Sequence, residues 1–207
     1  MGGAVTRATP ILEVQGVERR FGGLVALTGV DMRIEAGEIF GLVGPNGSGK
    51  TTLTNAITGF YPPNKGSIRL TGEDITGLRP HRIAAHGVAR TFQNLALFNG
   101  LTVLDNIMLG RHIHMRVGVL RTAFYWWLAR PDEVANRAIC EEIIEFLQLE
   151  GIRHELVDGL PIGLKKRVEL ARALAAEPRL LILDEPMAGM NQEEKEYMAR
   201  FILDARA

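Results

Sequence analysis

The sequence has a single cysteine, no long apolar run and no excess of charge of either sign. One thiol cannot form an internal disulfide, which excludes an extracellular fold held by disulfide bridges and favours a reducing compartment. No stretch approaches the ~20 apolar residues that a membrane-spanning helix needs. Residues 1–20 lack the basic start and the apolar run of a signal peptide. We therefore expect any role at a membrane to come through a partner.

The charge balance argues against a dedicated nucleic-acid binder. Lys and Arg number 24 and Asp and Glu also number 24, whereas such proteins usually carry a basic excess. A chain of 207 residues is long enough for one sizeable domain, or for a core with a subdomain. Cys140 lies in a helical pattern with Ile143 and Ile144, so we interpret it as a core residue and not as a reactive thiol.

The hydrophobic pattern predicts a mixed α/β architecture. Apolar or alternating segments predict strands over residues 11–20, 24–34, 39–43, 66–75, 88–91 and 180–183. Apolar stripes predict helices over residues 50–59, 133–149 and 164–176, and two more that begin near Leu104 and Gln192. Segment 39–43 is apolar throughout, so we expect a strand that is buried on both faces. The order of β-rich, α-only and then β-α segments predicts an α/β core interrupted by a helical insertion.

A glycine-rich loop follows segment 39–43 and matches the pattern G-x-x-x-x-G-K-[ST]. Its residues are Gly44, Pro45, Asn46, Gly47, Ser48, Gly49, Lys50 and Thr51. Glycines let backbone N–H groups turn towards phosphate oxygens, and the following helix adds the positive end of its dipole. Lys50 would reach the β- and γ-phosphates, and Thr51 would give its hydroxyl to Mg²⁺. We predict that this loop binds the phosphates of a nucleotide, and we include the adjacent Thr52 in the site.

The apolar strand 180–183 ends in two carboxylates, Asp184 and Glu185, which is the Walker B pattern. Asp184 would hold Mg²⁺ directly or through water. Glu185 would take or polarise the proton of the attacking water. Such an ending is common alone, but together with the glycine-rich loop it predicts an ATP-hydrolysing site in which Lys50 and Glu185 are catalytic.

These motifs resemble the ABC transporter ATPase family, and the resemblance covers nearly the whole chain. It implies a P-loop NTPase (RecA-like) α/β core with an antiparallel β subdomain and an inserted α-helical subdomain. We expect the first part of the core over residues 1–95, the helical subdomain over 96–177 and the Walker B part over 178–207.

The resemblance also assigns residues that the patterns alone do not. Phe21, in the segment RFGGLVAL, looks like the aromatic residue that stacks on adenine, and we place Val25 of the same segment with it in the nucleotide site. Packing at a strand end is the alternative for Phe21. Gln93 resembles the Q-loop glutamine, which in the family contacts Mg²⁺ and the attacking water. The segment 189–191 resembles the D-loop, with Asn191 where the family usually has Asp.

The family's signature motif, L-S-G-G-Q, is altered in this chain. The corresponding residues are Leu160, Pro161, Ile162, Gly163 and Leu164. Pro161 removes both a hydroxyl and a backbone donor. In the family this helix points its N-terminus at the γ-phosphate held by a second subunit, so the resemblance implies that Gly163 contacts ATP in trans. The basic run 165–167 is either an anion site or a solvated helix face, and we favour the solvated face.

ATPases of this family place a switch histidine beyond the D-loop. All five histidines of this chain precede Asp184, so none corresponds to it. We expect either a fragment of a longer protein or a degraded copy, and we hypothesise that the 207-residue form binds nucleotide weakly and hydrolyses it poorly.

Residues 90–94 (RTFQN), 97–98 and 101–107 (LTVLDNI), with a long insertion before Asp132, resemble the ATPases of branched-chain amino acid importers. The ATPases of urea and amide importers have similar sequence features. Phe98 and the aromatic run 124–127 either dock a coupling helix of the membrane subunit or pack inside the helical subdomain.

The resemblance implies an ATP-binding subunit that couples ATP binding and hydrolysis to the uptake of a small solute. It would lie peripherally on the cytoplasmic face of the inner (cell) membrane. Its partners would be a second ATP-binding subunit arranged head to tail, integral membrane permease subunits and, indirectly, a solute-binding protein, with no nucleic acid. Two alternatives are a soluble ABC ATPase that acts on DNA or ribosomes, and a non-catalytic nucleotide-binding fragment.

Overall fold

The computed structural model describes residues 9–91, 96–114 and 130–206. Its residues form two compact units, which we describe separately: the first contains the residues up to Val88 together with Arg206, and the second runs from Ala89 to Ala205. None of the helices in the described ranges combines the length and the apolar character that a bilayer crossing requires. The predicted domain boundaries at residues 95 and 177 stay predictions.

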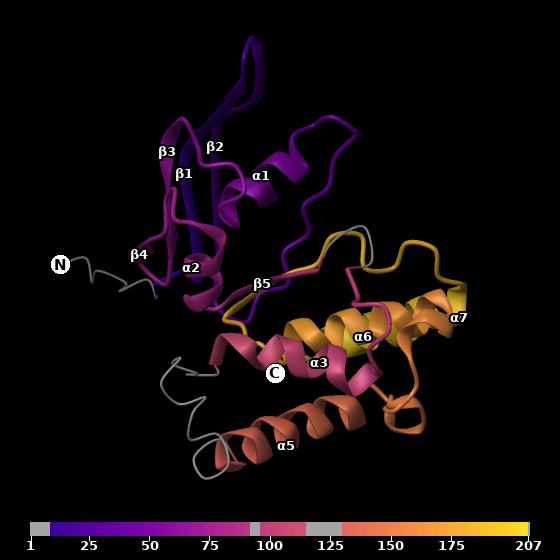
Figure 1. Cartoon of the computed structure of the whole chain (residues 1–207). Coiled ribbons are helices and arrows are strands. Elements are labelled where there is room, and N and C mark those ends of the chain that lie inside the picture. The colour runs from indigo at the N-terminus through magenta and orange to yellow at the C-terminus, as the bar shows by residue number, and fades with distance from the viewer. Residues whose placement is uncertain (1–8, 92–95, 115–129, 207) are drawn as a thin grey trace, which may run out of the picture. The chain divides into compact units, whose positions relative to one another are not determined.

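The first unit is built on an antiparallel sheet with the strand order β2-β1-β3-β4, shown in Figure 1. The strands are β1 (Leu12–Phe21), β2 (Leu24–Ile34), β3 (Lys65–Leu70) and β4 (Glu73–Asp74). Helices α1 (Lys50–Ile57) and α2 (Pro80–Ala85) complete the unit. Alternating residues of β1 and β3 are buried and form the core of the sheet, among them Leu12, Val14, Ile68 and Leu70.

Two strand predictions in this unit are wrong. Residues 66–75 form a hairpin and not one strand, because Thr71 and Gly72 both adopt positive φ, at 49° and 84°, as a two-residue hairpin turn requires. Residues 39–43 belong to neither described sheet. A strand buried on both faces needs strands beside it, and without them Ile39 is 48% exposed and Val43 is 93% exposed.

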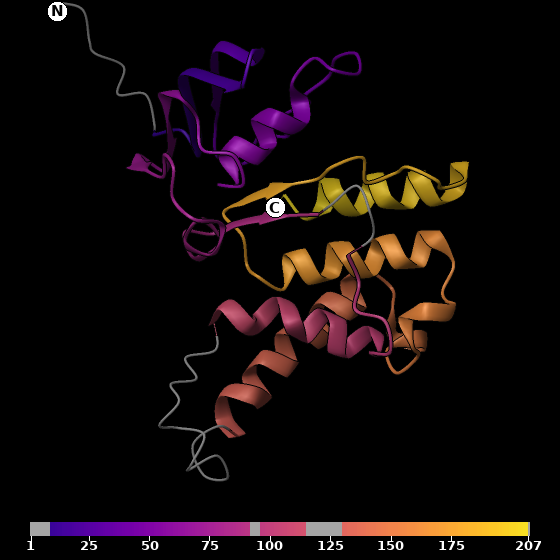
Figure 2. The same ribbon diagram turned by 45° about the horizontal axis from the view of Figure 1, so that its top comes forward.

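The second unit is mainly helical, and a pair of short strands, β5 (Val88–Arg90) and β6 (Leu180–Ile182), begins at its boundary with the first. Its helices are α3 (Val103–Gly110), α5 (Arg130–Phe146), α6 (Ile162–Leu174) and α7 (Gln192–Asp204), with 3₁₀ turns at Arg111–His114, Glu150–Ile152 and Val157–Gly159. Helix α3 packs against both α5 and α6, as Figure 2 shows. The four predicted helices are confirmed, with ends that differ by a few residues.

The core of the second unit joins α3, α5, α6 and α7 in one apolar cluster, which includes Ile107, Ile144, Val168 and Phe201. Cys140 is fully buried in this cluster, so its interpretation as a core residue is confirmed. Burial raises the pKa of its thiol to about 11.

A buried arginine lies at the edge of this cluster. Arg111 donates to the Asn136 side chain on α5 and to the carbonyl oxygen of Ala175 just after α6, both at 2.9 Å. Its guanidinium also lies 2.9 Å from the Glu177 carboxylate. The Arg111 guanidinium thereby finds polar partners on α5 and at the C-terminal end of α6, which a buried charge requires.

Candidate functional site

The predicted phosphate loop forms a tight turn ahead of α1. The backbone N–H of Ser48 donates to the carbonyl oxygen of Pro45 at 3.2 Å. Gly47 and Gly49 adopt positive φ, at 81° and 91°, a region that costs a glycine little and other residues more. The Nζ of Lys50 donates to the carbonyl oxygens of Gly44 at 2.6 Å and of Pro45 at 2.9 Å. The lysine ammonium therefore lies over its own loop.

The N-terminus of α1 has the features of an anion site. The helix begins at Lys50 after a left-handed Gly49. Among the described residues, no side chain caps this end, and the first turn contains no acidic residue. The backbone N–H groups and the helix dipole are therefore available to an anion such as phosphate.

Two glycines of the loop make close contacts that a side chain would prevent. A Cβ at Gly49 would lie 2.8 Å from the carbonyl oxygen of Ala26 on β2, and one at Gly44 would lie 2.7 Å from Oγ of Ser48. The loop thus needs glycine both for its dihedral angles and for its fit against β2. This backbone shape suits a polyphosphate, so the donor set fits the predicted nucleotide.

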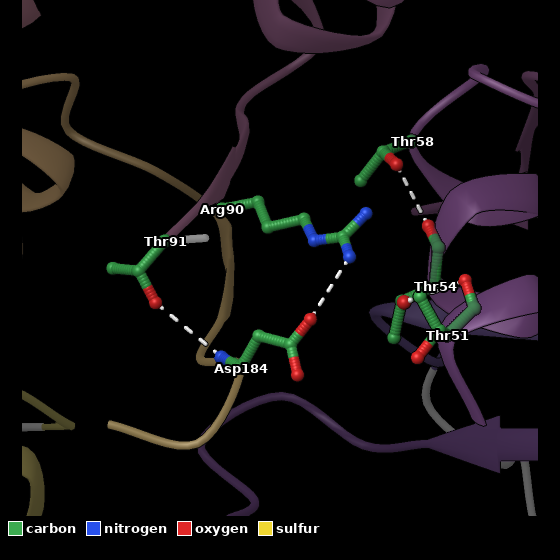
Figure 3. A network of polar contacts seen from close by, with 6 residues as sticks. All are labelled: Thr51, Thr54, Thr58, Arg90, Thr91 and Asp184. Carbon is green, nitrogen blue, oxygen red and sulfur yellow. Dashed lines mark hydrogen bonds and ion pairs between the residues drawn. The ribbon is translucent and has the colours of Figure 1, made fainter. Parts of the chain in front are cut away.

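The threonines of α1 line up along the helix, as Figure 3 shows. Thr54 donates to the carbonyl oxygen of Thr51 at 3.1 Å, and Thr58 donates to that of Thr54 at 2.7 Å. Thr51 is exposed in the first turn and Thr52 is half-buried beside it. An exposed hydroxyl at the start of the helix is the type of oxygen ligand that Mg²⁺ accepts.

The predicted adenine platform lies at the tip of the β1–β2 hairpin. Phe21 pairs with Leu24 across the turn, and Val25 lies opposite Arg20 in the next pair. The Phe21 ring is 37% exposed and meets the Tyr61 ring edge-on, with 5.2 Å between centroids. The Arg19 guanidinium lies 4.6 Å from the same ring.

The predicted Walker B carboxylates follow β6 closely. Thr91, just after β5, donates its N–H to the carbonyl oxygen of Ile182 at 3.0 Å, and its Oγ1 accepts from the N–H of Asp184 at 3.3 Å. Nη2 of Arg90 lies 3.0 Å from Oδ2 of Asp184, as drawn in Figure 3. These contacts hold the Asp184 carboxylate at the ends of the two paired strands. Gln93, predicted two residues further on, lies outside the described residues.

Glu185 has an unusual backbone. Its φ is 47°, in the left-handed region that non-glycine residues rarely adopt. Its carbonyl oxygen accepts from Nζ of Lys166 on α6 at 3.4 Å. The residue itself is exposed. A general base has to reach a water molecule, so this exposure suits the predicted role.

The basic run 165–167 is not a solvated face, so that prediction is wrong. Lys166 is 5% exposed, and the Arg167 guanidinium lies 5.7 Å from the centroids of both the Tyr197 and Phe201 rings of α7. Lys165 and Arg167 are half-buried, and Lys165 donates to the carbonyl oxygen of Asp158. Long aliphatic stems allow such cations to pack against neighbours while the head group finds a polar partner. Lys166 and Arg90 are the site residues that the sequence analysis missed.

The altered signature segment begins α6. Pro161 occupies the N-cap position with extended backbone. Gly163 is buried, and a Cβ there would collide with the side chain of Glu194 on α7. Glu194 and Asn191 cap α7 reciprocally, at 2.9 and 3.0 Å, so the predicted D-loop residue serves here as a helix cap. The contact of Gly163 with ATP in trans stays a prediction.

Comparison with known proteins identifies the family. Residues 27–188 match the ABC transporter model. The chain belongs to the ABC transporter family. It is 40% identical over 198 residues to the high-affinity branched-chain amino acid transport ATP-binding protein BraF of Pseudomonas aeruginosa, covering 96% of this chain and 78% of the relative. It is 36% identical over 201 residues to the corresponding protein LivG of Escherichia coli, covering 95% of this chain and 77% of the relative.

A solved ATP-binding cassette of an ABC transporter has the same fold. It matches with a TM-score of 0.80 and 32% sequence identity, over 95% of this chain and 77% of that one. The predicted P-loop NTPase fold and the predicted family are therefore confirmed. ATPases of the ABC transporter family bind ATP and couple its hydrolysis to transport. The two relatives are named as ATP-binding proteins of high-affinity branched-chain amino acid transport.

Proposed function

We propose that the chain is the ATP-binding subunit of an ABC importer for branched-chain amino acids, and that it binds Mg²⁺-ATP through residues 44–52 and Asp184. The observation that carries the nucleotide site is the loop ahead of α1, in which the Lys50 ammonium lies over the loop carbonyls and the described residues provide no side-chain cap for the helix N-terminus. The names of the relatives support the choice of solute.

The roles follow from the contacts. Lys50 would exchange the carbonyl oxygens of Gly44 and Pro45 for phosphate oxygens, which carry a full charge and make stronger hydrogen bonds. The exposed face of the Phe21 ring would stack on adenine, with Val25 beside it. Glu185 and Gln93 would orient the attacking water.

The residues present fit a magnesium ion that is bound mainly through the nucleotide. Within the described residues, no three His, Cys, Asp or Glu side chains form a group that could hold a metal alone. Mg²⁺ usually takes one or two protein oxygens and completes its shell with phosphate and water. Thr51 and Asp184 offer a hydroxyl and a carboxylate of this kind, and Gln93 would add an amide oxygen. Bound there, the ion would neutralise charge on the β- and γ-phosphates during transfer.

The family arrangement supports the remaining partners. We infer that two ATP-binding subunits pair head to tail on the cytoplasmic face of the cell membrane, with Gly163 of one chain near the ATP of the other. ATP binding and hydrolysis would move the paired subunits, and this movement would be passed to the permease subunits. A solute-binding protein would deliver the solute. Because Pro161 offers neither a hydroxyl nor an N–H, the contact in trans would rely on the N–H of Gly163 and on the dipole of α6.

Titration with a fluorescent ATP analogue in Mg²⁺ tests the nucleotide site. We expect saturable binding by the parent chain and a loss of about tenfold or more in affinity for Lys50→Ala, since a charge-assisted contact to phosphate is removed. Lys65→Ala is the matched control, because Lys65 lies on β3 of the same unit and pairs only with Glu18 among the contacts seen. Equal binding by the two variants would contradict the proposal.

Uptake by a reconstituted transporter tests the solute. Labelled leucine, isoleucine and valine should be taken up with ATP, whereas urea and short amides should not. Uptake of urea or amides alone would reassign the importer class. Retention of the chain on nucleic acid in place of a permease would favour the soluble ATPase.

A further inference from the structure

The carboxylate assigned to the metal already has a cation of the chain beside it. Nη2 of Arg90 lies 3.0 Å from Oδ2 of Asp184 (Figure 3). The Arg90 side chain is 7% exposed and that of Asp184 is 23% exposed. Charged side chains this far from solvent form stronger pairs than those on the surface, because the pair is screened less.

The two strands fix this pair in place. Arg90 is the last residue of β5, and Asp184 follows β6 by two residues. The Thr91 backbone and hydroxyl bond to Ile182 and to the N–H of Asp184, immediately beside the pair. The side chains therefore start from backbones that are held together, so the ion pair costs little further ordering.

A metal ion and a guanidinium compete for one carboxylate. Two cations close to the same group repel each other, and Oδ2 already accepts from a charged donor. Without Arg90, a carboxylate that is mostly removed from solvent would lose its compensating charge, which destabilises the fold. Arg90 therefore raises the stability of the metal-free chain and lowers the affinity of the site for metal.

We propose that Arg90 is a built-in counter-ion of Asp184 that sets the Mg²⁺ concentration at which the nucleotide site fills. Arg90 balances the carboxylate before metal enters, and Mg²⁺ takes over that role when Mg²⁺-ATP binds. Arg90 is thus a positioning residue, acting through Asp184 and not on the nucleotide itself. This inference rests on the proposed nucleotide site.

The test is a Mg²⁺ titration of ATP-analogue binding, compared between the parent chain, Arg90→Gln and Arg153→Gln. We expect Arg90→Gln to lower the Mg²⁺ concentration for half-maximal binding about three- to tenfold, as expected for the loss of a competing charge-assisted contact. Arg153→Gln is the matched control, because Arg153 pairs with Glu141 at 2.9 Å elsewhere in the same unit. Its midpoint should equal that of the parent.

Thermal unfolding in EDTA and in Mg²⁺-ATP gives a readout that is independent of turnover. Arg90→Gln should unfold at a lower temperature than the parent in EDTA, and Mg²⁺-ATP should stabilise it by a larger shift. Arg90→Lys keeps the charge and serves if the glutamine variant does not fold, and its midpoint should stay near that of the parent. An unchanged or raised Mg²⁺ midpoint in Arg90→Gln, or a lowered one in Arg90→Lys, would overturn the inference. A parent chain that shows no saturable binding would instead overturn the nucleotide site itself.

Discussion

The ammonium of Lys166 on α6 donates a hydrogen bond to the carbonyl oxygen of Glu185. This contact links α6, the helix that begins in the altered signature motif, to the residue proposed as general base. The contact is 3.4 Å long, and Lys166 is 5% exposed. Glu185 has a positive φ of 47°. This backbone conformation costs free energy in a non-glycine residue, and it persists only where the surrounding structure stabilises it. We infer that Lys166 helps to hold this backbone.

Replacing Lys166 by methionine should reduce turnover more than nucleotide binding. Methionine keeps the apolar stem but removes the donor, so the Glu185 backbone is held less firmly. We expect kcat to fall about three- to tenfold, since small misplacements of a catalytic group are costly, with little change in the Kd for ATP. Lys165→Met is the control, because Lys165 donates to Asp158 away from Glu185. Equal kcat values for the two variants would show that Lys166 does not position Glu185.

Gly49→Ala should destabilise the first unit and weaken ATP binding. Its Cβ would lie 2.8 Å from the carbonyl oxygen of Ala26, and its φ of 91° is strained for alanine. We expect a loss of about 2–4 kcal/mol in the free energy of unfolding from strain and overlap together. Urea denaturation measures it. Gly47→Ala carries a similar φ of 81° but meets nothing within 4 Å, so it should lose less, and an equal loss would contradict the close-contact argument.

The Cys140 thiol should react slowly at neutral pH. The thiolate is the reactive form, and burial raises the pKa of this thiol to about 11 while its side chain is fully buried. Labelling by a thiol reagent at pH 8 should therefore be at least about a hundredfold slower in the folded chain than in urea. Because the folded pKa lies above the unfolded one, this group favours unfolding progressively as pH rises from about 8.5 towards 11. Rapid labelling of the folded chain would contradict the assigned burial.

Asn106→Ala should cost the second unit more than a surface change of the same kind. The side chain is fully buried, accepts from the N–H of Phe98 at 2.8 Å, and donates to the carbonyl oxygens of Phe98 and Thr102. Removing it takes away three hydrogen bonds of a fully buried side chain and leaves the N–H of Phe98 without this acceptor, so we expect a loss of about 2–3 kcal/mol in the free energy of unfolding. Gln192→Ala is the control, because the Gln192 side chain donates to Glu196 at an exposed position. A loss below 0.5 kcal/mol, the usual range for surface substitutions, would contradict the assigned burial.

The motifs that depend on local chemistry could be predicted from the sequence. The phosphate loop forms the expected turn before a helix because its glycines and lysine act within a few residues of each other. Strands β1 and β2 and helices α3, α5, α6 and α7 follow from periodicity, because each buries one face against a neighbour. The hairpin at Thr71 was missed because the turn needs a positive φ at a threonine, which composition does not reveal.

The contacts between distant segments could not be predicted in the same way. The Arg90–Asp184 pair depends on β5 and β6 being neighbours although they lie about ninety positions apart in the chain. Lys166 is buried and donates to Glu185 in the turn after β6, a contact between distant segments. Its charge alone predicted a solvated face. Segment 39–43 shows the opposite error, since an apolar run predicts burial only where neighbouring strands are present.

The fit of Gly163 against Glu194 has a mechanical consequence. The Glu194 side chain lies directly against Gly163, so the opening turn of α6 and the opening turn of α7 are in contact. Glu194 is in turn fastened to Asn191 by two hydrogen bonds. We therefore expect a displacement of one opening turn to be transmitted to the other, which would couple the start of α6 to the segment that follows Glu185.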